Sequence, residues 1–324
     1  MKAGMLDYLR LCRLPNVFTA LADILMGYAF VQQGIAFPDL KSAGARLCLL
    51  VASAALYTAG MVLNDVYDIE IDRVERPQRP LPAGRIDWQW ARRFGYSLLI
   101  IGIAAAWLAG VAGPHQAASV WRAGVISFLL AACVIAYDAG MKRTWLGPVV
   151  MGSCRFFNVL LGMSLAAHVD TSTPWLLGYE PSQLLVAGGV GTYIVGVTWF
   201  ARTEAETSQR LPLILAVLVM AAGFFLLASY PRFGGEYGRV AFRRPEILWP
   251  ALLTVLFLPI AKRCLAAVMN PSPQRVQVAI KNCIASLIIL DASICLAAGS
   301  HEWAIVTVSL IVPMLLLGRW VYST

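Results

Sequence analysis

Long apolar runs recur from one end of the chain to the other, and they constrain its fold more than any other feature. Each run has about 17 to 25 residues, which lets an α-helix cross about 30 Å of hydrocarbon. Proline interrupts the run from 247, so nine or ten spans are expected. The runs lie at 16–34, 44–66, 94–113, 120–138, 147–167, 184–201, 211–229, 247–268, 279–298 and 302–320. The sequence therefore predicts an all-α, polytopic transmembrane bundle around a central cavity.

The composition excludes an ordinary soluble domain. Charged residues make up 14% and hydrophobic residues 59% of the chain, whereas a soluble domain has about a quarter charged residues. The first 15 residues are polar and lack a signal-peptide pattern, so the first apolar run is expected to remain as a span. Because no linker of distinct composition divides the chain, residues 1–324 are interpreted as one membrane-embedded domain.

The positive charges are distributed between short loops, which favours a topological role over nucleic-acid binding. The net charge is +8. With a cytoplasmic N-terminus, seventeen Lys and Arg residues fall in inside segments and seven in outside segments. This bias satisfies the positive-inside rule and places the loops after the second, fourth, sixth and eighth spans in the cytoplasm. We expect an integral protein of the bacterial plasma membrane.

An acidic motif ends the second span. Asn64, Asp68 and Asp72 are spaced i, i+4 and i+8, so on a continuing helix they lie along one stripe with Asp65 beside it. Like charges at this spacing repel, and a cation that takes hard oxygen ligands and shares its shell with phosphates compensates for them. The motif predicts a Mg²⁺ site. The alternative is a solvated acidic helix end in which Asp72 pairs with a nearby arginine.

The segment that follows the acidic motif carries a family resemblance. It reads RPLPAGRI at residues 79–86, directly after NDVYDIEID at 64–72. Together they resemble the first signature of the UbiA superfamily of intramembrane prenyltransferases. Arg13 and Asn16 at the first span are similar to the family's R-x-x-N opening, and Tyr137 to Lys142 resembles its tyrosine-to-lysine segment with one extra residue between them.

The resemblance implies a reaction and roles for individual residues. The reaction is Mg²⁺-dependent transfer of an isoprenyl group from a prenyl diphosphate to an aromatic or lipid-like hydrophobic acceptor in the membrane. Asp68, Asp72 and Lys142 are the implied catalytic residues. Asn64, Asp68, Asp72 and Glu204 are the implied metal ligands, and Arg79, Lys142, Arg143 and Arg202 are the implied diphosphate-binding residues. For Lys142 and Arg143, anchoring at the positive side of the membrane is the alternative.

The second acidic signature of the family is not intact. After the sixth span the chain has Arg202, Glu204 and Glu206 but no aspartate. The two glutamates differ by about 200° around a helix, so both reach one metal only if the helix unwinds. Glu206 and Arg202 can also pair with each other at i and i+4. A non-catalytic prenyl-lipid binding protein or transporter on the same bundle therefore remains the alternative function.

Three further polar residues lie inside apolar runs. Arg155 and Asn158 belong to the fifth run and Asp291 to the ninth. Ionisable residues within a membrane span indicate a functional site by default, and a structural pair between two of them is the alternative.

Overall fold

The computed structural model describes residues 4–32, 42–113, 120–166, 176–202, 209–233 and 239–321. All regular secondary structure in these ranges is helical. Ten helical segments of the described chain are long and apolar enough to cross a membrane, at the upper limit of the predicted nine or ten. The chain is an integral membrane protein with an all-α fold.

Nine spans are single helices, and their limits follow the predicted runs closely. They are α2 (Leu14–Val31), α3 (Ala43–Tyr67), α5 (Trp88–Ala112), α6 (Arg122–Ala139), α7 (Gly147–Gly162), α8 (Pro181–Ala201), α9 (Arg210–Ser229), α10 (Pro245–Met269) and α11 (Pro273–Ala297). The tenth span consists of α12 (His301–Ser309) and α13 (Ile311–Gly318). Two short helices, α1 (Met5–Leu11) and α4 (Ile69–Glu75), lie outside the spans.

Proline has different consequences in the last spans. Pro250 and Pro259 lie inside α10, which continues through both of them as one helix of 25 residues. Membrane helices tolerate proline where neighbouring groups satisfy the freed backbone carbonyl. In the tenth span the helix is divided at Leu310, three residues before Pro313. Since only 11% of this span is buried, it lies at the periphery of the bundle.

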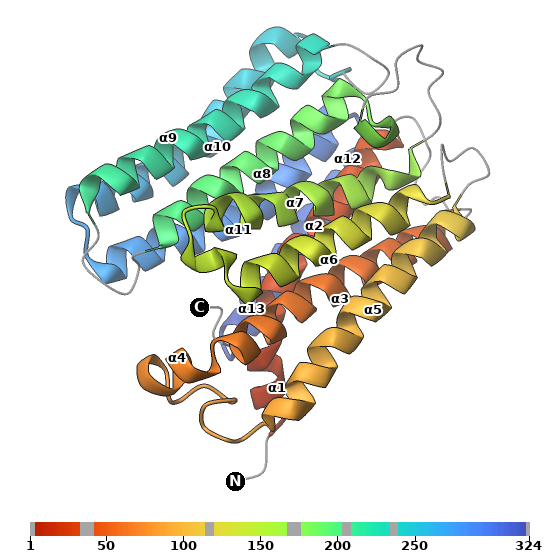
Figure 1. Cartoon of the computed structure of the whole chain (residues 1–324). Helices are drawn as coiled ribbons and strands as arrows, with labels where there is room; N and C mark the ends of the chain where they lie inside the picture. Colours follow the sequence, from red (N-terminus) through yellow and green to blue (C-terminus); the bar gives the residue numbers. More distant parts are fainter. Residues whose placement is uncertain are drawn as a thin grey trace.

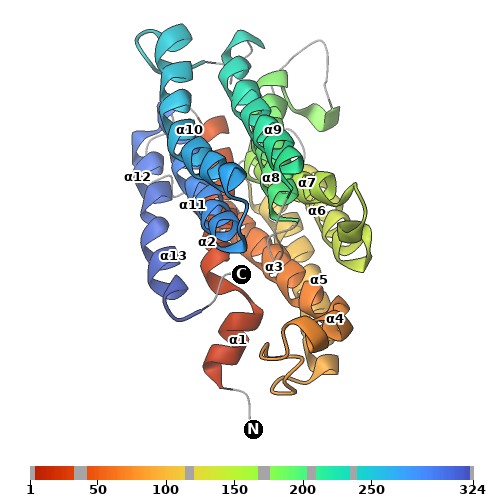
Figure 2. The ribbon, with the colours of Figure 1, turned by 90° about the vertical axis from the view of Figure 1, so that its left-hand side faces the viewer.

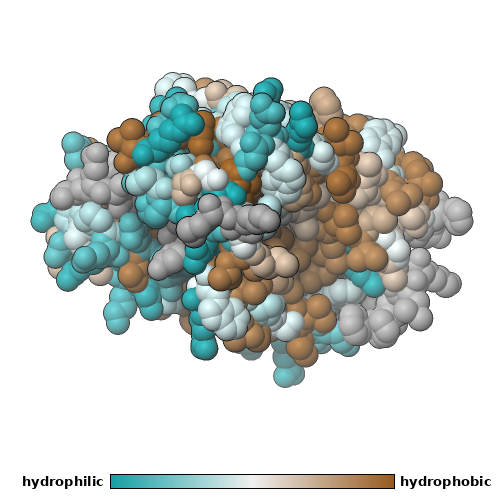
Figure 3. Space-filling view, turned by 90° about the horizontal axis from the view of Figure 1, so that it is seen from below, coloured by the Kyte–Doolittle hydropathy of each residue, from teal (hydrophilic) through white to brown (hydrophobic). Residues whose placement is uncertain are grey.

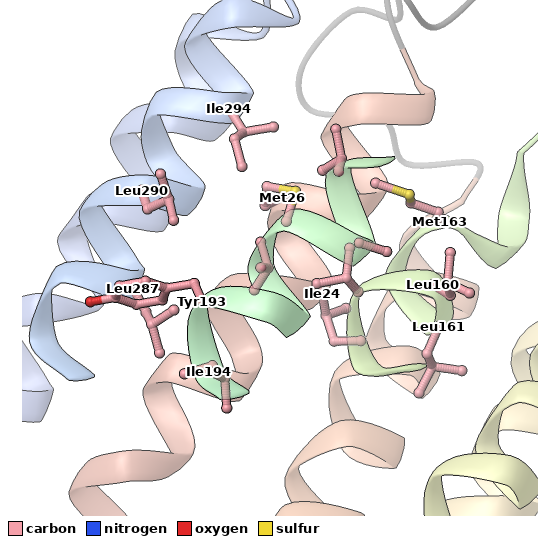
Figure 4. Close-up of a cluster of buried hydrophobic side chains, with 14 of the residues drawn as sticks. Ile24, Met26, Leu160, Leu161, Met163, Tyr193, Ile194, Leu287, Leu290 and Ile294 are labelled. Atoms are coloured by element: carbon pink, nitrogen blue, oxygen red, sulfur yellow. The ribbon is translucent and has the colours of Figure 1, made fainter. Parts of the chain in front are cut away.

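Helix α2 forms the centre of the bundle. It packs against α3, α7, α11, α12 and α13, and 83% of its span is buried (Figures 1 and 2). Ile24 and Met26 of α2 meet apolar side chains of α7, α8 and α11 in a continuous core (Figure 4). A polar residue on α2 is therefore enclosed by protein, and needs partners on the neighbouring helices.

Glycine allows α2 and α7 to approach closely. A Cβ atom on Gly162 would lie 2.8 Å from the backbone oxygen of Ile24, and one on Gly27 would lie 2.7 Å from the oxygen of Val159. Small residues at a membrane helix interface let the backbones touch. This contact positions the residues of α7 that face α2.

Two arginines of the predicted outer segments have packing roles. The guanidinium of Arg46 lies 5.0 Å from the ring centre of Tyr28 and 4.8 Å from that of Trp303. The guanidinium of Arg122, a residue only 1% exposed, lies 5.1 Å from the ring centre of Tyr179. Cation–π contacts of this kind stabilise packed elements. These two charges are therefore part of the bundle, and not of free outer loops.

The helices α1 and α4 lie at the same end of the bundle (Figure 1). Viewed from below, hydrophilic side chains gather over one part of the surface and hydrophobic side chains cover much of the rest (Figure 3). The acidic motif belongs to the end that carries α4.

Candidate functional site

A cavity of about 160 Å³ lies between α2, α3, α6 and α7. Its walls are mainly apolar, and its polar groups lie toward its two ends. The two ends are far apart, because Ser53 at one end precedes Asn64 at the other by eleven residues on α3, or about 16 Å along the helix. Arg13, Asn64, Tyr137 and Asp138 line the cavity near the helix ends next to α4, and this end is called the mouth, whereas Ser53, Tyr57, Arg155 and Asn158 line it deeper in the bundle.

Three predicted site residues meet at the mouth. Lys142, in a short 3₁₀ turn (Met141–Arg143), donates from Nζ to Oδ1 of Asn64 at 3.0 Å and to Oδ2 of Asp68 at 2.7 Å. Arg143 reaches the other oxygen of Asp68 at 3.4 Å, and its side chain is 59% exposed. The two segments are more than seventy residues apart in the chain, so this convergence arises from the packing of α6 and α7 against α3.

The acidic motif does not act as one stripe. Helix α3 ends at Tyr67 and α4 starts at Ile69, although the backbone hydrogen bonds from Asp68 to Asn64 and from Asp72 to Asp68 are both kept. The carboxylate of Asp72 turns to Arg79, at 2.7 Å, and not to Lys142. In this structure Asp72 therefore pairs with Arg79 while Asn64 and Asp68 share Lys142, and a role of Asp72 as a metal ligand stays a prediction. The physical reason is that a fixed guanidinium lies nearer to it.

Asp65 and Asp72 belong to a separate, largely buried ion-pair network. Arg79 also contacts Asp65, at 3.2 Å, and Arg13 contacts the same oxygen at 3.1 Å. The pairing of Asp72 with an arginine agrees with the alternative interpretation of the motif, except that Asp72 is only 3% exposed. The network joins the start of α2, the end of α3, α4 and the following loop.

The loop after α4 owes its shape to the residues of the RPLPAGRI segment. Leu81 and Ile86 are buried against Leu11 and Val62, which fixes the loop on the bundle. Arg85 binds Asp7 of α1 at 2.9 Å. Gly84 has a φ of 66°, a left-handed conformation that favours glycine. These contacts hold Arg79 over the acidic motif.

The elbow between α1 and α2 holds Arg13 in a left-handed conformation, with φ 42°. For a residue other than glycine this costs about 1–3 kcal/mol, which the ion pair with Asp65 offsets. Burial raises the pKa of the neighbouring Cys12 thiol to about 11. Because the thiolate is the nucleophile, Cys12 is unreactive at neutral pH.

A polar network closes the inner end of the cavity. Arg155 donates to Asp23 Oδ2 at 2.7 Å, and Asn158 donates to the same oxygen at 2.8 Å. Ser53 donates to Asn158 Oδ1 at 2.7 Å. Asp291 of α11 interacts electrostatically with both Asp23 and Arg155. Arg155 is paired, but with Asp23 and not with Asn158 or Asp291 as the structural alternative expected, and no pattern in the sequence pointed to Asp23.

The other candidates are distributed around the site. Asn16 is buried and shares a side-chain hydrogen bond with Tyr57. Tyr137 lines the cavity. Arg202 is exposed at the end of α8, and the described residues show no ion pair for it. Glu204 and Glu206 lie outside the described residues.

The donor set at the mouth suits a hard divalent cation. Within the described ranges, no group of three or more His, Cys, Asp or Glu side chains is arranged as a metal site. However, an amide oxygen of Asn64 and a carboxylate oxygen of Asp68 converge on the ammonium of Lys142, which marks a point where a cation is favoured. Mg²⁺ commonly binds one or two carboxylates and completes its shell with water and substrate phosphates. The residues therefore fit this ion.

Comparison with known proteins identifies the family of the chain. The model of the UbiA prenyltransferase family matches residues 20–323. The chain belongs to the UbiA prenyltransferase family. The bundle of membrane-spanning helices is thus that of a UbiA-family chain.

Curated relatives match part of this UbiA chain. The digeranylgeranylglyceryl phosphate synthase of Saccharolobus solfataricus is 32% identical over 53% of this chain and 54% of its own length. The synthase of the same name from Sulfolobus acidocaldarius is 41% identical over 30% of this chain and 33% of its own. The chain thus spans about half the length, or less, of these relatives.

Solved structures match the fold over nearly the whole chain. A UbiA homologue from Archaeoglobus fulgidus bound to DMAPP and Mg²⁺ covers 94% of this chain and 99% of its own, with a TM-score of 0.57 and 14% identity. A digeranylgeranylglyceryl phosphate synthase structure covers 94% and 98%, with a TM-score of 0.56 and 19% identity. At these identities the likeness concerns the fold.

Proposed function

We propose that this protein is a Mg²⁺-dependent prenyltransferase that moves an isoprenyl group from a prenyl diphosphate to a hydrophobic acceptor within the membrane. The observation that carries the proposal is the cavity between α2, α3, α6 and α7. Its walls are apolar, and Asn64, Asp68 and Lys142 meet at its mouth. A substrate with an anionic head and an apolar tail matches this distribution.

The cations at the mouth bind and orient the diphosphate. Lys142 and Arg143 lie next to Asp68, and Arg143 is exposed enough to reach a ligand. Mg²⁺, held by Asn64 and Asp68, neutralises charge on the diphosphate when it is bound. Arg79 is 14% exposed and already contacts two carboxylates, so its first role is to hold Asp65 and Asp72. Direct contacts of Arg79, Arg202 or Glu204 with the substrate or metal remain predictions.

The reaction breaks the allylic C–O bond, and its electron pair leaves with the diphosphate. The positive residues at the mouth stabilise this developing charge in a site of low dielectric constant. The apolar wall keeps water from the reactive carbon, so the acceptor forms the new bond and then loses a proton. Leu56, Leu130 and Val134 supply part of this wall.

A lipid acceptor is favoured over an aromatic one. The two curated relatives are named digeranylgeranylglyceryl phosphate synthases, a name that specifies a glyceryl phosphate lipid. We infer that this chain also prenylates a lipid-like acceptor with a polar head.

We also propose that the cavity mouth faces the cytoplasm at the plasma membrane. The excess of Lys and Arg in the segments on this side supports the orientation. The named relatives are archaeal, so they lend no support to a bacterial origin.

The test is incubation of the purified chain with Mg²⁺, radiolabelled prenyl diphosphates, and separate lipid and aromatic acceptors. We expect a labelled lipid product and release of diphosphate, with both lost in Asp68→Asn. Binding of the labelled diphosphate without turnover on any acceptor would support a non-catalytic binding protein. Movement of intact label across a vesicle membrane would support a transporter.

A further inference from the structure

Asp138 is a buried carboxylate at the cavity that the proposed mechanism does not use. It lies in the last turn of α6 and is 3% exposed. Its Oδ2 atom is buried and has no hydrogen-bond partner among the described residues. Leaving a buried polar atom unsatisfied is unfavourable, and more so for a charged group. A bound ligand that contacts this oxygen would therefore stabilise the side chain in its buried position.

The position of Asp138 shows where that ligand lies. Asp138 and Asn64 line the same cavity from different helices, α6 and α3. Asp138 interacts electrostatically with Lys142 and Asp68, the residues that meet Asn64 at the mouth. Asp138, which has one unsatisfied oxygen, thus lines from α6 the same cavity that Asn64 lines from α3.

We propose that Asp138 is a third protein ligand of the divalent cation held by Asn64 and Asp68. This inference rests on the proposed function. The set contains one amide and two carboxylate oxygens, all hard donors, with substrate phosphates and water to complete the shell. It draws on two helices, so the cation links α3 to α6 at the mouth.

The proposal also concerns the missing second aspartate motif. Because the segment after the sixth span has no aspartate, a carboxylate supplied by α6 compensates in part for its absence. The alternative is that Asp138 serves only as a counterion that positions Lys142. The two roles differ in one measurable property, because a ligand determines which metal binds and a counterion does not.

The test is Mn²⁺ binding by the purified full-length chain in the presence of inorganic diphosphate, followed by electron paramagnetic resonance. Asp138→Asn keeps the shape of the side chain and should weaken Mn²⁺ binding about 10-fold or more. Asp68→Asn should do the same. Asp291→Asn is the control for the loss of a buried carboxyl, because Asp291 is fully buried but does not line the cavity. It should bind Mn²⁺ like the parent.

A second variant excludes a purely structural effect. Asp138→Cys places a soft thiolate at the same position, and should bind Cd²⁺ more tightly than the parent while losing Mn²⁺. The parent carries Cys154 in the same cavity and provides the Cd²⁺ baseline. Size-exclusion profiles establish that each variant is folded.

The outcomes separate the inference from the proposed function. If Asp138→Asn binds Mn²⁺ like the parent while Asp68→Asn does not, Asp138 is not a ligand and the proposed function stands. If Asp138→Cys gains no Cd²⁺ affinity although Asp138→Asn weakens Mn²⁺, the counterion role replaces the ligand role. Absence of Mn²⁺ binding in the parent would overturn the metal site and the proposed function together.

Discussion

Asp23, Arg155 and Asp291 place two acidic groups and one basic group in the middle of the bundle. Asp23 and Asp291 are fully buried, and the side chain of Arg155 is 11% exposed. Asp23 holds Arg155 at 2.7 Å, and Asp291 lies close enough to both residues to interact with them electrostatically. The cluster therefore has two carboxyl groups for one guanidinium, and either acid can serve as its counterion.

This arrangement predicts unequal costs for removing the two carboxylates. Asp291→Asn leaves the Asp23–Arg155 ion pair in place and replaces a carboxyl with an amide of similar shape, so the free energy of unfolding should change by no more than about 1 kcal/mol. In Asp23→Asn, Asp291 is still available as the counterion of Arg155. The loss of stability should therefore lie between those of Asp291→Asn and the double variant. The double variant leaves the guanidinium without a counterion, which costs about 3–5 kcal/mol for a buried pair.

Thermal unfolding in detergent, followed by tryptophan fluorescence at one scan rate, measures these differences. At about 2 °C per kcal/mol for a large chain, the double variant should melt about 6–10 °C below the parent. The loss of stability in the double variant should exceed the sum of the losses in the two single variants, because each acid can replace the other as the counterion of Arg155. If Asp291→Asn alone destabilises as much as the double variant, Asp291 carries the negative charge and the reasoning is refuted.

Four further outcomes are expected. Asp68→Ala and Asp72→Ala should each abolish Mg²⁺-dependent transfer in the radiolabel assay, while expression stays near normal. Full activity in either variant would contradict the assignment of that residue to the site. A cysteine introduced by Gln78→Cys should be inaccessible to an impermeant maleimide in intact cells, and labelling from outside would reverse the proposed topology. Gly162→Ala should lower stability by about 1–3 kcal/mol through overpacking against α2, visible as a lower melting temperature; an unchanged melting temperature would contradict the close contact. Glu204→Asp should keep much of the transfer activity and Glu204→Gln should lose most of it if this residue binds a second metal, whereas equal activities would exclude a carboxylate ligand there.

The spans and the first acidic motif could be predicted because both depend on local sequence. The thickness of the hydrocarbon layer requires an apolar run of a certain length, whatever the neighbouring helices do. The run from 245 to 269 illustrates this, since it remains one helix in spite of two internal prolines. The positions of Asn64 and Asp68 one helical turn apart likewise predicted that their side chains lie together, and both accept hydrogen bonds from Lys142, whereas Mg²⁺ binding there stays a prediction.

The partners of these residues could not be predicted in the same way. The i, i+4, i+8 spacing assigned Asp72 to the same point as Asp68, but a break at Asp68 and the buried loop beneath Arg79 turned Asp72 to another cation. Asp138 carried a weak signal, an acidic residue directly after Tyr137 at the end of an apolar run. Nothing in that run showed that the side chain faces the cavity.

The amino-acid sequence was enough to establish that this chain is a helical membrane protein whose second span ends in an acidic motif. The tertiary structure alone decided that Asp23 meets Arg155, that Lys142 meets Asp68, and that Asp138 faces the same volume as Asn64. The reason is physical. Lipid and protein interior are both apolar, so hydropathy distinguishes them poorly, and the rotation of each helix follows from close contacts such as that between Gly27 and Gly162.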